Sequence, residues 1–165
     1  MKDLISVLVA SGAVAIYIAL FLGSFSPMHC RCTVALVGTI SVLLSFFAGF
    51  GLLYYCGQQT STFHLWLPFL LMCISVEHMF IICSSIDQTD LELSAYTRVH
   101  EAFSHSGPSI TITSLATCLA FASGMFCSLE ALKSFCLFAT ACVAMNWLCT
   151  MTIFSAAIVW DTRRV

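Results

Sequence analysis

One stretch, Phe63-His-Leu-Trp-Leu-Pro-Phe-Leu-Leu-Met-Cys-Ile-Ser-Val-Glu-His-Met-Phe-Ile-Ile-Cys-Ser-Ser-Ile86, is long and apolar enough to cross a bilayer. Glu77 and His78 interrupt it near its midpoint. A carboxylate at the centre of a hydrophobic helix costs about 2.5 to 3.5 kcal/mol on insertion scales, so it is usually neutral, paired or facing a wet cavity inside a bundle. The pair is therefore our first candidate functional site.

The composition around this stretch predicts an all-α integral membrane protein. The 165 residues are 60 % hydrophobic and 8 % charged, whereas soluble domains carry about a quarter charged residues. A water-facing surface cannot be built from so few charges. The net charge of −2 argues against nucleic acid as a partner.

Gaps between charged residues predict five membrane spans. The gap from Cys32 to Val76 would make a helix of about 67 Å, roughly twice the hydrocarbon thickness, so it must fold back once, near Gly57. We expect a single domain over residues 1–165, with spans at about 4–25, 33–56, 63–86, 109–127 and 134–160.

Small residues recur every three or four positions in the first two spans. The first span carries Ser11, Ala15, Ala19 and Gly23, and the second carries Gly38, Ser41, Ser45 and Gly49. Such stripes let two helix backbones approach closely, so both spans are expected to pack against neighbours.

The segment 87–108 is polar and predicts a short amphipathic helix on the membrane surface. The capping-box pattern Thr89-Asp-Leu-Glu92 comes before apolar residues at helical spacing. Gly107-Pro108 should end this helix and begin the fourth span.

Basic residues predict the orientation of the chain. Arg31, Arg98, Arg163 and Arg164 fall on one side of the predicted spans, against Lys2 and Lys133 on the other. The positive-inside rule then places the connecting loops and the C-terminus in the cytoplasm. The first span would run from outside to inside, which suggests that the chain is a piece of a larger protein.

Cysteine and histidine spacing predicts neither a metal site nor an enzyme. Eight of the ten cysteines lie in the spans or at their ends, as reduced residues. Cys30 and Cys32 flank Arg31, where they are either palmitoylated or unmodified. The chain holds no His-Glu-x-x-His and no Gly-x-Ser-x-Gly pattern, and adjacent residues such as Glu77 and His78 point about 100° apart on a helix. We therefore expect no catalytic residue, no metal and no cofactor.

Several motifs resemble the sterol-sensing domain of Patched, Patched-related and Niemann-Pick type C proteins. Leu67-Pro-Phe-Leu70 followed by Val76-Glu-His-Met-Phe80 is similar to a family stretch in which Leu-Pro-Phe-Leu comes before a Gly-Val-Asp-Asp/Asn-Met-Phe-like motif. Gly107-Pro-Ser-Ile-Thr-Ile-Thr-Ser-Leu115 resembles the start of the next family helix, and Asp161-Thr-Arg-Arg164 resembles the exit of the last one. The resemblance implies a five-helix bundle of the resistance-nodulation-division superfamily, with a cytoplasmic amphipathic helix.

The resemblance also implies candidate site residues. The coupling acids of the family fall on Glu77 and His78, and the glycine before them falls on Ser75. Thr117 and Asn146 stand at positions where some relatives carry further acidic residues. A sterol or other lipid would bind in a pocket between the first and third spans, beside the small residues Ser11, Ala15 and Ala19.

Two functions follow as hypotheses. In the first, the chain is the bundle of a Patched-related sterol or lipid transporter or receptor in the plasma membrane or an endomembrane, a fragment or half-transporter that pairs with a second bundle. Proton or cation relay would then run through Glu77 and His78. In the second, it is a stand-alone, sterol-responsive module that contacts membrane proteins without transport. In a purely structural interpretation, a protonated Glu77 is hydrogen-bonded to Thr113 or Thr117, His78 is bonded to a carbonyl, and both merely tie the bundle together.

Overall fold

The computed structural model describes residues 12, 32–57, 62–89 and 94–162, and regular structure in them is helical throughout. The helices are α2 (Cys32–Tyr55), α3 (Leu67–Asp87), α4 (Ala95–Gly124), α5 (Glu130–Cys149) and α6 (Ser155–Thr162). A 3-10 turn, η1 (Thr62–Trp66), leads into α3, and a π-helical turn, η2 (Thr150–Phe154), joins α5 to α6. The predicted first span, 4–25, lies outside the described residues except for Gly12.

Three segments are long and apolar enough to cross a membrane: Val37–Tyr55, His64–Ile86 and Glu130–Trp160. They agree with the predicted second, third and fifth spans. The last segment is a single rod because α5, η2 and α6 follow one another without a break. Pro68 lies at the start of α3, where its missing N–H costs least.

The prediction for 87–127 was wrong in its boundaries. Gly107-Pro108 does not end a helix, because α4 runs without a break for 30 residues with Pro108 inside it. Pro108 is exposed, so its ring meets no neighbouring helix, while Ala102 and Ile110 on either side of it are buried in the core. Packing on both sides thus outweighs the lost backbone hydrogen bond, which costs about 3 kcal/mol.

The first turns of α4 also differ from the predicted surface helix. The helix begins at Ser94, whose Oγ accepts a hydrogen bond from the Thr97 N–H at 3.3 Å, rather than at the Thr89 capping box. A separate amphipathic helix on the membrane surface is not what the structure shows, since these residues are the first turns of α4. Their apolar face packs into the bundle, where Val99 and Ala102 are buried in the main core.

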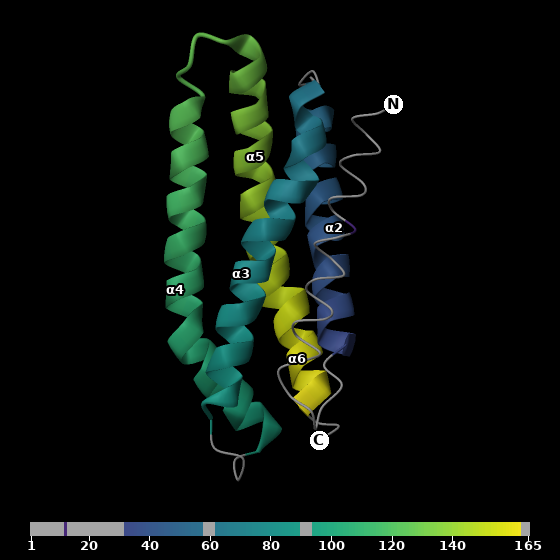
Figure 1. Ribbon diagram of the computed structural model, residues 1–165, viewed down its shortest axis with the longest axis vertical. Helices are drawn as coiled ribbons and strands as arrows, with labels where there is room; N and C mark the ends of the chain where they lie inside the picture. The colour runs from purple at the N-terminus through teal and green to yellow at the C-terminus, as the bar shows by residue number, and fades with distance from the viewer. Residues whose placement is uncertain (1–11, 13–31, 58–61, 90–93, 163–165) are drawn as a thin grey trace.

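The helices form an elongated bundle in which α5 lies between α2 and α4, and α3 crosses obliquely from the α2 side to the α4 side (Figure 1). The main core includes Leu71, Ile82, Ile110, Cys142 and Phe154. A smaller core lies near the start of α3 and is formed by Leu67, Phe138 and Ala139.

Large apolar side chains also cover much of the outer surface, as expected for a protein surrounded by lipid. They include Ile40, Leu43 and Phe47 on α2, and Ile112, Leu115 and Leu119 on α4. The eight cysteines whose side chains the structure describes are all free, and three of them, Cys83, Cys136 and Cys142, are buried.

Candidate functional site

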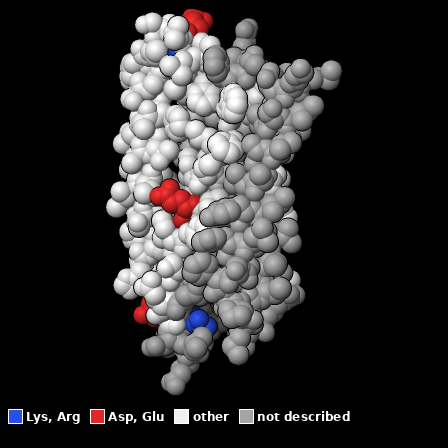
Figure 2. Space-filling model, in the orientation of Figure 1, with Lys and Arg blue, Asp and Glu red and all other residues white. Residues whose placement is uncertain are grey.

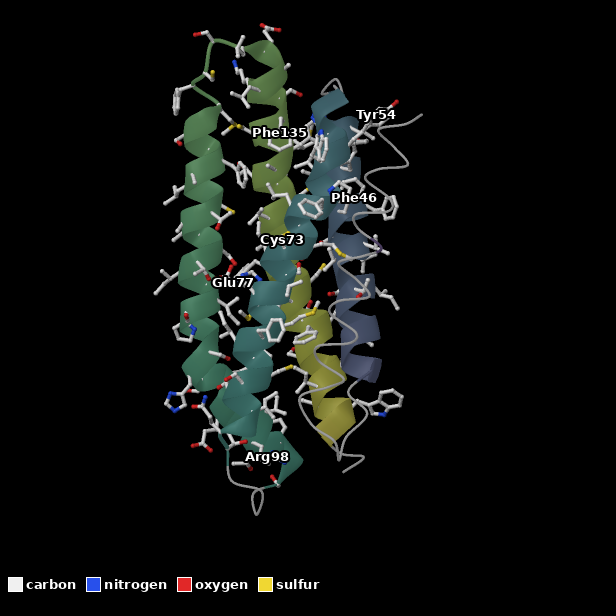
Figure 3. The ribbon with its side chains drawn as sticks, viewed as in Figure 1. Phe46, Tyr54, Cys73, Glu77, Arg98 and Phe135 are labelled. Carbon is white, nitrogen blue, oxygen red and sulfur yellow. The ribbon has the colours of Figure 1, made fainter. Side chains whose placement is uncertain are left out.

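Helix α3 presents the candidate pair on two different faces. His78 and Ser75 lie three residues apart, share the inner face and are 1 % and 2 % exposed. Glu77 lies between them in sequence and is exposed. In Figure 3 it lies in the space between α3 and α4 at mid-height of the bundle. The two residues therefore do not act as one acid–base pair.

Asn146 on α5 joins three helices through one amide oxygen. Its side chain is fully buried. Its Oδ1 accepts hydrogen bonds from Ser75 Oγ of α3 at 2.8 Å and from Ser45 Oγ of α2 at 3.3 Å. Ser45 also donates to the Val42 carbonyl at 2.7 Å. The π-helical turn η2 begins four residues after Asn146. The widened turn between α5 and α6 therefore directly follows the buried amide of Asn146.

His78 joins α3 to α4. Its Nε2 lies 3.2 Å from Ser114 Oγ, and the tautomer of the ring decides which of the two atoms donates. The Nδ1 of His78 and the Nδ2 of Asn146 are buried without a hydrogen-bond partner. A buried polar atom left unsatisfied costs about 1 to 3 kcal/mol. A bound water could satisfy either atom; the ring nitrogen of His78 could also take up a proton, whereas the amide nitrogen of Asn146 can only donate a hydrogen bond.

Glu77 is the acidic group of the described chain that lies farthest from both ends of the bundle. Figure 2 shows acidic atoms at mid-height, where Figure 3 labels Glu77, while the other charged atoms coloured on this face lie toward the two ends of the bundle. No hydrogen bond or ion pair joins its carboxylate to another described side chain. The hydroxyl of Thr117, which is half-buried, donates instead to the Thr113 carbonyl at 2.8 Å. Thr113 in turn donates to carbonyls of its own helix.

The structure thus divides the predicted site residues into three groups. Ser75 and Asn146 are hydrogen-bonded to each other, and His78 is buried on the same face of α3 as Ser75. Glu77 and Thr117 take no part in that network. The lipid-pocket candidates Ser11, Ala15 and Ala19 lie outside the described residues.

Sequence reasoning missed two members of the network as site residues, Ser45 and Ser114. Ser45 was visible in the small-residue stripe of the second span, and Ser114 in the hydroxyl-rich start of the fourth. Spacing alone placed Ser45 on a packing face, and it could not pair either serine with a particular residue of another helix.

Comparison with known proteins gives this bundle a family. The family model for the "Sterol-sensing domain of SREBP cleavage-activation" matches residues 27–165. Similar curated proteins include a Niemann-Pick type C1-related protein of Toxoplasma gondii (30 % identical over 78 % of this chain) and Protein patched homolog 3 of Caenorhabditis elegans (28 % over 87 %). NPC1-like intracellular cholesterol transporter 1 of Homo sapiens is 27 % identical over 90 % of the chain. The matched part covers 11 %, 10 % and 12 % of these relatives, respectively. With its helical bundle, its apolar outer surface and this match, the chain belongs to the sterol-sensing domain family.

Proposed function

We propose that the chain is the membrane bundle of a Patched-related sterol or lipid transporter or receptor, and that Glu77 takes part in proton or cation coupling. Family membership supports the ligand class, because one relative is named as an intracellular cholesterol transporter. The observation that carries the coupling role is the position of Glu77, a carboxylate on the outer face of the bundle at mid-height without a partner in the described chain.

The surroundings of Glu77 support a second bundle as its partner. An ionised carboxylate that faced lipid at this depth would cost about 2.5 to 3.5 kcal/mol. Contact with a second transmembrane bundle, with water at the junction, would remove that cost. The chain spans about a tenth of the length of its curated relatives. The rest of such a protein would offer a partner for this face.

We further propose that the chain crosses the membrane several times with the Arg98 end of the bundle in the cytoplasm. Arg98 Nε donates to Thr89 Oγ1 at 3.3 Å, so the guanidinium is held at the loop between α3 and α4. Lys133 lies at the opposite end, in the first turn of α5. The C-terminus would then also be cytoplasmic.

The alternative function is a stand-alone, sterol-responsive module without transport. The Ser75–Asn146–Ser45 network favours it, because Asn146 at its centre places an uncharged amide where the resemblance implies an acid in some relatives. The two functions differ in what they require of Glu77. A relay needs its titratable proton, whereas a module needs only that the bundle folds.

The test is gradient-dependent sterol or lipid efflux from cells that express the complete protein carrying Glu77→Gln. The amide keeps the size of the side chain but removes the proton. We expect efflux to fall to the level of cells without the protein, with expression and thermal stability unchanged.

Glu130→Gln is the matched control, because it makes the same chemical change at an exposed residue in the first turn of α5, at the end of the bundle. It should transport normally. Normal efflux by the Glu77→Gln protein would contradict the relay and leave the module as the better proposal.

A further inference from the structure

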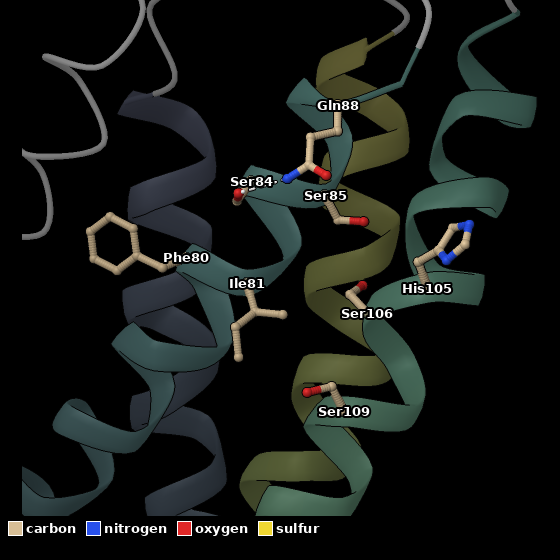
Figure 4. Close-up of a pocket in the computed structure, with 8 residues that line it drawn as sticks. All are labelled: Phe80, Ile81, Ser84, Ser85, Gln88, His105, Ser106 and Ser109. Atoms are coloured by element: carbon tan, nitrogen blue, oxygen red, sulfur yellow. Dashed lines mark hydrogen bonds between the residues drawn. The ribbon is translucent and has the colours of Figure 1, made fainter.

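The two halves of α4 meet their neighbours differently. Along its first half, α4 and α3 border an open groove of about 480 Å³, whose lining includes Phe80, Gln88 and Ser109 (Figure 4). At its C-terminal end, α4 lies directly against α5, and a short loop of residues 125–129 joins these two helices. In Figure 1 this loop lies at the end of the bundle opposite the loop between α3 and α4. The close contact of α4 with α5 brings two thiols near each other.

Gly124, the last residue of α4, forms a notch for the side chain of Cys136. A Cβ atom at Gly124 would lie 2.5 Å from Cys136 Sγ and 3.5 Å from Cys136 Cβ, so the sulfur occupies the space that a side chain at this position would fill. Cys136 belongs to the second turn of α5 and is 5 % exposed. Its thiol therefore packs against the last turn of α4.

Cys127 lies one turn beyond that notch. The backbone continues past Gly124 in 3-10 geometry, because the N–H groups of Met125, Phe126 and Cys127 donate to carbonyls three residues earlier, at 3.2 to 3.3 Å. Residues three apart are eclipsed in such a turn, which rises about 2.0 Å per residue, so Cys127 follows about 6 Å beyond Gly124 on the same face. The thiol of Cys127 lies within electrostatic reach of the thiol of Cys136.

The two thiols are free in the structure and differ in access. Cys127 is exposed, so an oxidant in solution can reach it, whereas Cys136 is buried and is reached by its neighbour. A disulfide needs Cα atoms about 4.4 to 6.8 Å apart. Cys127 lies in a loop outside the helices, so a shift of this residue toward α5 breaks little regular structure.

We propose that Cys127 and Cys136 form a disulfide bond that links the α4–α5 loop to α5. The oxidant is a small-molecule disulfide or a thiol–disulfide oxidoreductase. The Cys127 thiolate attacks the disulfide of the oxidant and displaces one thiol. The Cys136 thiolate then attacks the Cys127 sulfur of the mixed disulfide and displaces the second thiol. The two cysteines lose two protons and two electrons, and the oxidant is reduced to two thiols.

The orientation proposed above places this loop outside the cytoplasm, where disulfides form and persist. Formation of the bond in cells rests on that orientation, whereas the pairing of the two thiols does not. The bond would close a ring of residues 127–136. It would tie the C-terminal end of α4 to α5, at the end of α4 that lies away from the groove.

The test is oxidation of the purified complete protein by glutathione disulfide, followed by blocking of the remaining thiols with N-ethylmaleimide and digestion with trypsin. Lys133 lies between the two cysteines, so trypsin separates a peptide of residues 99–133 from one of residues 134–163. We expect the two peptides to stay linked until a reductant is added. The same link should be present in protein from cells whose thiols were blocked at lysis.

Cys127→Ser should abolish the linked species. Cys118→Ser and Cys149→Ser are the matched controls, because each removes another cysteine from one of the two peptides, and both should leave the link unchanged. Since Cys127 is exposed, its serine variant tests the pair without altering the core.

Two results would each overturn the proposal: free thiols at Cys127 and Cys136 after oxidation, or a link that survives in the Cys127→Ser protein. A link that forms with glutathione disulfide but is absent from cells would support the pair and contradict the proposed orientation instead.

Discussion

At the residue scale, two of the positions at which this chain departs from the pattern it resembles lie in contact. Ser75 falls where that pattern has glycine, and Asn146 falls where some relatives have an acid. The hydroxyl of Ser75 donates to the amide oxygen of Asn146 at 2.8 Å. The hydroxyl thus provides a donor for an oxygen that is fully buried. We infer that the two residues stabilise the contact between α3 and α5 as a pair.

A double-mutant cycle tests this pair. Ser75→Ala, Asn146→Leu and the combined variant should show a coupling free energy of about 0.6 kcal/mol, the average for a hydrogen bond between membrane helices. Reversible denaturation in detergent measures the free energy of unfolding of each variant. The pair Ser123→Ala with Asn146→Leu is the control, and it should be additive since Ser123 bonds only within α4. Additivity in the first cycle would show that the bond contributes nothing.

At the element scale, hydrophobic patterns predicted the helices well and their ends less well. The runs at 33–56 and 63–86 correspond to α2 and to η1 with α3, because a long and strongly apolar segment has few alternatives to a helix in lipid. The break expected at Pro108 does not occur. A proline disfavours the helix only near its own position in the sequence, whereas Ala102 and Ile110 are held by packing against other helices. For the same reason, the sequence offered His78 as a candidate but could not name Ser114 as its partner.

Close packing of α2 on α5 depends on Gly49. A Cβ atom at this position would lie 2.7 Å from Cys142 Sγ and 2.9 Å from Cys142 Cα, so the two helices would have to separate. Gly49→Ala should lower the free energy of unfolding by about 1 to 3 kcal/mol. Gly51 on the same helix has open space around its Cβ position, and Gly51→Ala should leave stability unchanged or raise it by up to about 1 kcal/mol. Equal effects of the two changes in a thermal unfolding experiment would contradict this helix contact.

At the scale of the whole molecule, α4 contains the predicted fourth span but is not among the three described segments that are long and apolar enough to cross a membrane. If it does cross, it is longer than the hydrocarbon layer. Its 30 residues make a helix of about 45 Å, against about 30 Å of hydrocarbon. The excess is at its N-terminal end, where Arg98 is half-buried and Glu101 is exposed. The first turns of α4 should therefore project from the hydrocarbon while they still pack on the last turns of α3.

The two ends of α4 should react with thiol reagents from opposite sides of the membrane. In a cysteine-free background, Tyr96→Cys places a thiol at an exposed position in the first turn, and Ser128→Cys places one in the exposed loop after the helix. If the arginine-rich side is cytoplasmic, an impermeant maleimide should label Ser128→Cys on intact cells and Tyr96→Cys only after permeabilisation. Each variant serves as the control for the other. The reverse pattern would invert the proposed orientation, and labelling of both from outside would show that α4 does not cross the membrane.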